Sequence, residues 1–174
     1  MKTLKYVLVF NLLVVTYCLN AQMVNVNRWV SPIVGDFTSI PENKGTDAQI
    51  SSWGYKDKIY QYRAYLSKPI GDATVVNRWE MPYCKEFILI AEHEISDQQM
   101  ISFGYKNKQF VFYAYRTPPE PAKDYVAVCR WVNAKPQGDN CRDFTLSVSQ
   151  AELTDAQLKS WGYSNVMIQF YVPR

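Results

Sequence analysis

The chain has a single histidine, His93, and this shortage narrows the chemistry open to it. Acid–base catalysis depends on positioned titratable groups, and His93 stands in a charged stretch between Glu92 and Glu94. No zinc-ligand spacing, phosphate-cradling loop or nucleophile elbow is present, and glycine is scarce, with 7 residues. We therefore predict no enzyme, no metal and no cofactor. The catalytic alternative is a reactive Cys84 assisted by His93.

A strong excess of either charge is also missing, since 19 Lys and Arg face 16 Asp and Glu. Binding to a nucleic-acid backbone requires a clustered basic face, so we predict no nucleic-acid partner. The chain is nevertheless rich in aromatic residues, at 15% against 20% charged residues. This balance is typical of a folded globular chain rather than a disordered one.

Long apolar runs are missing except at the N-terminus. Lys2 and Lys5 precede an apolar run over Tyr6–Val15, and small residues follow. This order predicts a secretory signal peptide over residues 1–21, because the run is shorter than the ~20 residues that span a bilayer. A lipid anchor at Cys18 is disfavoured by the bulky tyrosine before it. We expect a secreted, extracellular protein without a membrane span.

The cysteines beyond the signal peptide are Cys84, Cys129 and Cys141, an odd number. For a secreted chain, one disulfide and one remaining thiol is the simple expectation. We predict a Cys129–Cys141 bond, because these two lie close in sequence. Cys84 is then free, or links two chains as a disulfide-bonded dimer. Cys84–Cys141 remains an alternative pair, because these two occupy equivalent positions of a repeat.

One motif occurs three times in the single domain predicted over residues 22–174. Each copy contains an Arg-Trp pair, a Thr/Ser-Asp-x-Gln stretch and an aromatic-Gly-Tyr stretch. The first two copies are offset by 50 residues, and the third carries about six extra residues. The copies cover about 25–66, 75–116 and 126–174. Repeats of this length indicate units that bury a shared core only by packing together.

Each repeat predicts one short helix. Thr46, Ser96 and Thr154 each precede a glutamine by three residues, which is the pattern of a capping box. Asp47, Asp97 and Asp155 follow at the first helical position, where the helix dipole favours an anion. Gly54, Gly104 and Gly162 end the helices in the left-handed conformation. Because so short a helix is unstable alone, we expect it to dock through Ile50 and Trp53 in the first repeat.

Three strands are expected around each helix. The Arg-Trp segments read as first strands, and the segments around Phe37, Phe87 and Phe144 as second strands. The last strand of each repeat alternates with period two, which predicts a buried face. Its three rows are Tyr60, Phe110 and Ile168; Tyr62, Phe112 and Phe170; and Ala64, Ala114 and Val172. The opposite face, with Gln61, Val111 and Gln169, is expected to be partly wet.

These elements predict a mainly β fold with one short helix per repeat. We expect a compact pseudo-threefold domain of three tandem repeats, with a β-trefoil-like plan or, as the second choice, a small propeller-like ring.

The recurring Arg-Trp pairs are the candidate ligand-binding residues: Arg28, Trp29, Arg78, Trp79, Arg130 and Trp131. In the binding hypothesis each tryptophan stacks on a sugar ring and each arginine binds a polar group. In the structural alternative the tryptophans lie in the core and the arginines bind carbonyls or a carboxylate. The helix-start aspartates are either arginine partners or simple helix-dipole partners.

The repeat resembles a tandem-repeat family of unknown function found in secreted bacterial and fungal proteins. The resemblance lies in Arg28-Trp29, Pro32, Gly35-Asp36-Phe37-Thr38 and Gly54-Tyr55 and in their counterparts. The histidine that the family places before the phenylalanine is missing, and so is its Glu-Gly after Gly-Tyr. The resemblance implies secretion, repetition and attachment to surface polymers, and it implies no chemistry.

The sequence thus favours a secreted, non-catalytic binding module for carbohydrate or an extracellular surface polymer. The alternative is a structural component of an extracellular matrix, of the shell, cuticle or adhesive type.

Overall fold

The structure is a computed structural model, in which we describe residues 22–30, 37–82, 86–133, 143–148 and 154–174. The predicted signal peptide lies outside these residues. In chain order the strands and helices are β1 (Met23–Val30), β2 (Phe37–Pro41), α2 (Asp47–Ser52), β3 (Lys56–Tyr65), β4 (Ala73–Met81), β5 (Glu86–Ala91), α3 (Asp97–Ser102), β6 (Lys106–Tyr115), β7 (Tyr125–Asn133), β8 (Asp143–Val148), α4 (Asp155–Ser160) and β9 (Tyr163–Pro173). Two short 3₁₀ turns, η1 (Glu42–Lys44) and η2 (Ala122–Asp124), complete the set.

The same strand–strand–helix–strand order occurs three times, and we name these segments unit 1 (β1–β3 with α2), unit 2 (β4–β6 with α3) and unit 3 (β7–β9 with α4). In each unit the first strand pairs antiparallel with the other two. Between units the strands meet at single pairs, Tyr65 with Tyr113 and Tyr115 with Tyr171, which join them into one open antiparallel sheet. The expected mainly β fold with short helices is confirmed.

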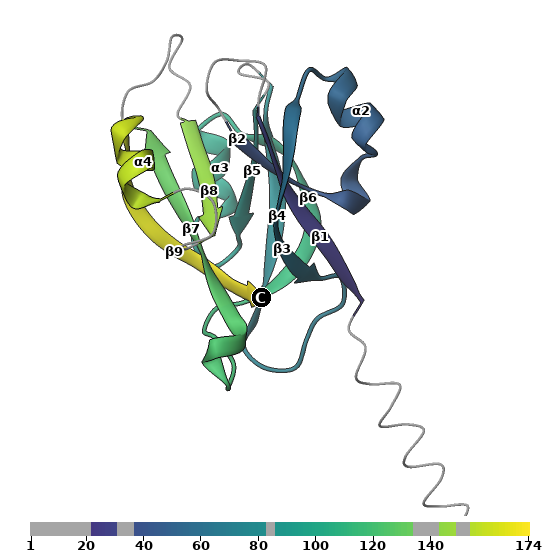
Figure 1. Cartoon of the computed structure of the whole chain (residues 1–174), viewed down its shortest axis with the longest axis vertical. Coiled ribbons are helices and arrows are strands. Elements are labelled where there is room, and N and C mark those ends of the chain that lie inside the picture. Colours follow the sequence, from purple (N-terminus) through teal and green to yellow (C-terminus); the bar gives the residue numbers. More distant parts are fainter. Residues whose placement is uncertain (1–21, 31–36, 83–85, 134–142, 149–153) are drawn as a thin grey trace, which may run out of the picture.

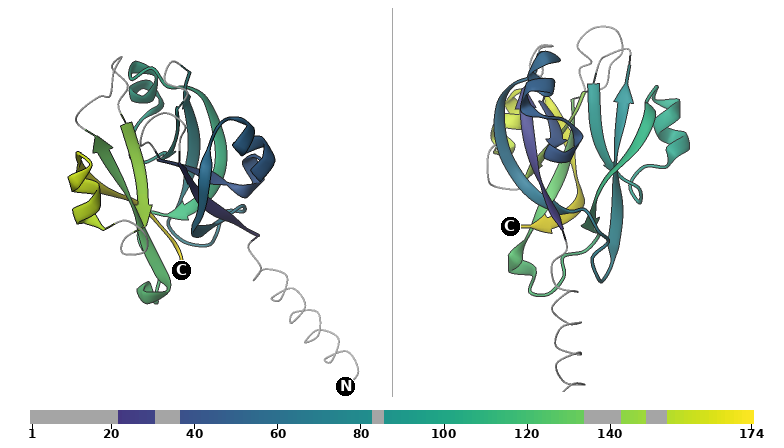
Figure 2. Two further views of the ribbon diagram at one scale, coloured as in Figure 1. Left: turned by 45° about the horizontal axis from the view of Figure 1, so that its top comes forward. Right: turned by 90° about the vertical axis from the view of Figure 1, so that its right-hand side faces the viewer.

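The helices form as the capping pattern predicts. In all three, the Thr or Ser side chain accepts from the glutamine backbone N–H, and the glutamine side chain reaches back to the cap residue. Gly54, Gly104 and Gly162 then adopt φ of 93°, 92° and 93°, which favours glycine. The three helices lie on different sides of the strands, at the periphery (Figures 1 and 2).

The main core is filled by side chains from all three units. Tyr62, Phe112 and Phe170 meet there edge to face, with ring centroids 5.8–6.2 Å apart. Smaller core residues from the other strands surround these rings, among them Val26, Val76 and Val128. Edge-to-face contacts are the favoured geometry for packed aromatic rings. The predicted burial is confirmed for two of the three rows: Tyr62, Phe112 and Phe170, and Ala64, Ala114 and Val172.

The predicted strand faces are wrong at two rows. Tyr60, Phe110 and Ile168 were expected in the core and are exposed, whereas Gln61, Val111 and Gln169 are buried. The cause is a bulge: Val26 pairs with Tyr62 while Asn27 pairs with Tyr60, so Gln61 is an extra residue. An extra residue shifts the alternation by one position. Units 2 and 3 carry the same register shift.

Within the described part of the chain, no helix is both long enough and apolar enough to cross a bilayer.

Candidate functional site

The tryptophans of the Arg-Trp pairs lie in the interior. Trp29, Trp79 and Trp131 are only 3%, 4% and 1% exposed. Each packs in a small cluster with an apolar residue of its own helix and with the tyrosine that follows the helix glycine, as Trp29 does with Ile50 and Tyr55. A ring enclosed on both faces offers no surface to a sugar. The burial of these three tryptophans favours the structural alternative, in which they lie in the core, and their role in ligand binding stays a prediction.

The arginines of the same pairs lie against the phenylalanines of the second strands. The Cζ atom of Arg28 is 4.9 Å from the Phe37 ring centroid, and that of Arg78 is 4.7 Å from the Phe87 centroid. Such distances allow a cation–π interaction. Burial lowers the pKa of Arg78, and the nearby carboxylate of Glu80 opposes this shift.

Arg130 faces a carboxylate from another unit. Its Nη2 atom lies 3.7 Å from Glu94 Oε2, and both side chains are about nine-tenths buried, at 9% and 10% exposure. Burial lowers the pKa of Arg130, while Glu94 raises it. The contact joins unit 2 to unit 3. A buried ion pair of this kind is costly to break, because removing one partner leaves a charge without compensation.

Half-exposed aromatic rings occur one residue beyond each helix. Trp53, Phe103 and Trp161 are the C-cap residues, and they are 47%, 36% and 47% exposed. Trp53 was expected to dock inward with Ile50, but only Ile50 is buried. The repeated motif predicts a site at the Arg-Trp pairs and not at these three rings, although the rings align at the start of each aromatic-Gly-Tyr stretch.

Two of these rings rest on a phenylalanine of a different unit. Trp161 stacks on Phe37 at 5.6 Å and 26°, and Trp53 lies 6.2 Å from Phe87. Phe37 and Phe87 are the same rings that the guanidinium groups of Arg28 and Arg78 contact. The arrangement at each of these junctions is thus an arginine, a phenylalanine and a half-exposed tryptophan.

Hydrogen bonds fix the backbones at these junctions. Thr38 Oγ1 donates to the carbonyl of Phe87 at 2.7 Å, and Thr145 Oγ1 donates to that of Phe37 at 3.4 Å. The phenylalanines are therefore held from a neighbouring unit through both the side chain and the backbone.

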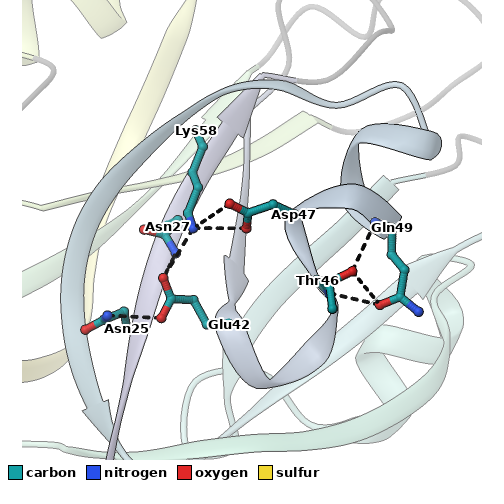
Figure 3. Close-up of polar contacts among 7 residues, drawn as sticks. All are labelled: Asn25, Asn27, Glu42, Thr46, Asp47, Gln49 and Lys58. Carbon is teal, nitrogen blue, oxygen red and sulfur yellow. Dashed lines mark hydrogen bonds and ion pairs between the residues drawn. The ribbon is translucent and has the colours of Figure 1, made fainter.

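A lysine network ties each of the first two helices to its own strands, and Figure 3 shows the network of unit 1. Lys58 Nζ donates to Asp47 at 3.0 and 3.1 Å and to Glu42 at 3.3 Å, and Asn27 donates to Glu42 at 3.2 Å. Lys108 makes the equivalent bonds in unit 2. The helix-start aspartates of units 1 and 2 thus pair with these lysines. This leaves their carboxylates occupied in structural contacts.

The network shifts the titration of its members. The strongest influence on the pKa of Lys58 is the hydrogen bond to Asp47, which raises it; burial opposes this shift, and the contact with Glu42 adds to it. For Glu42, burial raises the pKa, but hydrogen bonds from Asn27, Lys58 and Asn25 outweigh it and leave the pKa lowered. Both shifts favour the charged forms, so the ion pairs persist through the neutral range.

Unit 3 has different residues at the network positions. Cys129 stands where units 1 and 2 have asparagine, and Val166 stands where they have lysine. Burial, followed by the charge of Asp155, raises the pKa of the Cys129 thiol. The thiol is therefore less reactive than an exposed one, because the thiolate is disfavoured.

The predicted Cys129–Cys141 disulfide is not present in the structure, in which Cys129 is a free cysteine. Cys84 and Cys141 lie outside the described residues, and so the alternative Cys84–Cys141 pair and the link between chains through Cys84 stay predictions.

His93 is held by a threonine. Its Nδ1 atom lies 3.0 Å from Thr74 Oγ1. Burial lowers its pKa, Glu94 and Asp72 raise it, and Arg116 lowers it further. The contact with Cys84 that the catalytic alternative requires falls outside the described residues. Among those that are described, no three His, Cys, Asp or Glu side chains gather as metal ligands would.

No protein-family model, curated protein or solved structure matches the chain. The resemblance to the secreted repeat family stays a prediction.

Proposed function

We propose that the protein is a secreted, non-catalytic binding module whose ligand is a carbohydrate or an extracellular surface polymer. The observation that carries the proposal is the set of half-exposed aromatic rings, one at the C-terminal end of each helix, two of which are tryptophans. A flat indole ring offers a large apolar face together with one polar N–H group. This combination suits a sugar ring, which has apolar C–H faces and polar edges.

The rings are well held before any ligand arrives, which favours binding. The backbone N–H of Trp53 bonds back to its helix, and a capping box fixes the other end of that helix. Phe87 supports the ring from another unit. Since less side-chain freedom is lost on binding, more of the contact energy remains as affinity.

We extend the proposal to the arrangement of the units, as a compact pseudo-threefold domain with a trefoil-like plan. The same pairing in every unit supports it, and so does the meeting of Tyr62, Phe112 and Phe170 from three units. Rings filling the centre favour this plan over a propeller, whose blades surround a channel. Similar sites on one domain would add avidity for a repeating polymer.

The test is binding of the protein to a panel of soluble and insoluble polysaccharides. We expect Trp53→Ala and Trp161→Ala each to weaken binding about tenfold, which corresponds to about 1.4 kcal/mol. Tyr60→Ala is the matched control, because Tyr60 is an aromatic residue of β3 with a similar exposure, 52%, and is not one of the C-cap rings. Loss of binding in the control alone would contradict the placement of the site.

The same experiment separates the alternative function. A structural matrix component need not bind any free polysaccharide. If the intact protein binds no member of the panel, the matrix role becomes the better account and the binding module is abandoned.

A further inference from the structure

The first halves of β3, β6 and β9 lie at an edge of the sheet. Each pairs on one side with the first strand of its own unit. On the other side, these strands meet each other only near their C-terminal ends, at Tyr65 with Tyr113 and Tyr115 with Tyr171. Among the described residues, no strand pairs with the outer edge of the first halves. Each unit therefore presents a stretch of open strand edge.

On β3 and β6 this edge is protected against pairing with another chain. Lys56 and Lys58 flank Asp57, which has a φ of 52°, and Lys106 and Lys108 flank Asn107, with a φ of 53°. Lysine side chains and irregular backbone are the usual means by which proteins block an exposed strand edge.

On β9 the lysines are missing, whereas the register shift that accompanies Asp57 and Asn107 recurs there, between Arg130 and Val132. The segment 164–168 contains no charged side chain. Val166, Met167 and Ile168 are 46%, 50% and 51% exposed in succession. Three consecutive exposed apolar residues on an open strand edge form the kind of surface that pairs with a further strand.

We propose that this edge of β9 binds the β9 edge of a second copy of the chain, antiparallel, about a twofold axis near Met167. Val166 of one copy then lies beside Ile168 of the other. The second copy is the occupant that the chemistry favours, because an uncharged apolar edge is complementary to itself in antiparallel pairing. The contact is a single strand pair, so the dimer forms and dissociates reversibly.

The test is sedimentation velocity of the full chain, produced in a secreting host, over a range of concentrations and with reductant present. We expect a monomer that converts to a dimer as the concentration rises. A monomer up to about 1 mM, the weak limit of specific association, overturns the proposal. So does a dimer that reductant abolishes, because it is held by a thiol, or an assembly larger than two.

The main variant is Val166→Lys, which gives β9 the lysine that the other two units carry at this position. The protein should accept it, because Lys58 and Lys108 fit the equivalent places. We expect it to weaken dimerisation at least tenfold, and Met167→Lys, which opposes two lysines at the axis, to do the same. Phe110→Lys on β6 is the matched control and should dimerise as the wild type does. A dimer that survives Val166→Lys, or is lost in the control, contradicts the proposal.

Discussion

Replacing Tyr62 by phenylalanine should stabilise the protein. The Tyr62 side chain is 1% exposed, and its hydroxyl has no hydrogen-bond partner among the described residues. The equivalent residues of the other units, Phe112 and Phe170, lack the hydroxyl and contact the Tyr62 ring edge to face. The hydroxyl is therefore buried at a place where the rest of the cluster is apolar.

The expected gain follows from two opposing terms. Burying a hydroxyl without a partner costs about 1–3 kcal/mol. Removing it leaves a void of about 10 Å³, which costs a few tenths of a kcal/mol at about 24 cal/mol per Å³. The net gain in the free energy of unfolding is about 1–3 kcal/mol. For a chain of this size each kcal/mol raises Tm by about 2–4 °C.

Urea and thermal unfolding measure the effect, with circular dichroism as the probe. An unchanged urea m-value would show that the shift reflects stability rather than a change in the exposed surface. Phe112→Tyr, which adds a buried hydroxyl in unit 2, is the matched control and should lose about 1–3 kcal/mol. If Tyr62→Phe instead loses stability by about 1 kcal/mol, the hydroxyl has a partner and the reasoning is refuted.

Three further changes test other parts of the structure. Lys58→Met should cost about 0.2–1 kcal/mol in urea unfolding at neutral pH, with the exposed Lys56→Met nearly neutral. The pKa of Glu42 is lowered and that of Lys58 is raised. The difference in the free energy of unfolding between the wild type and Lys58→Met should therefore fade below about pH 4.5 and above about pH 10.5. Burial lowers the pKa of His93, so the unfolded chain binds more protons there than the folded one. The free energy of unfolding should therefore fall as the pH drops below about 6.5. His93→Asn should flatten this slope when unfolding is measured at several pH values. Gly104→Ala should cost about 1–2 kcal/mol through its φ of +92°, since the added Cβ meets nothing within 4 Å, and a neutral result in thermal unfolding would contradict this.

The local elements could be predicted because their determinants are local. A capping box and a terminal glycine lie within a few residues of each other, and all three helices form where Thr46, Ser96 and Thr154 place them. The central rings at Tyr62 and its counterparts also follow from a repeated pattern, since equivalent apolar positions pack alike in each unit.

The strand faces could not be read from alternation alone. The extra residue at Gln61 depends on which residues of β1 it faces, and sequence spacing on β3 does not show this. Gln61 is then kept in the interior by hydrogen bonds with Ser39 and with the Leu146 carbonyl of unit 3. Because these partners are distant along the chain, the sequence around Gln61 does not show that it is buried.

The position of the candidate site was missed for a similar reason. Trp29 lies in a strand and Trp53 at the end of a helix, and the local sequence does not show which of the two is buried. Trp29 lies in a buried cluster of its own unit with Phe87 of unit 2 packed against it, whereas Trp53 lies half-exposed beside the same Phe87. Only the packing between units distinguishes the buried ring from the half-exposed one.

The most direct test of the account is the response of the five tryptophan indole N–H signals to a bound polysaccharide fragment, followed by NMR. The account predicts that the signals of Trp53 and Trp161 shift on titration, while those of Trp29, Trp79 and Trp131 stay in place. Shifts confined to the latter three would contradict it, because they would place the ligand at rings that the structure buries.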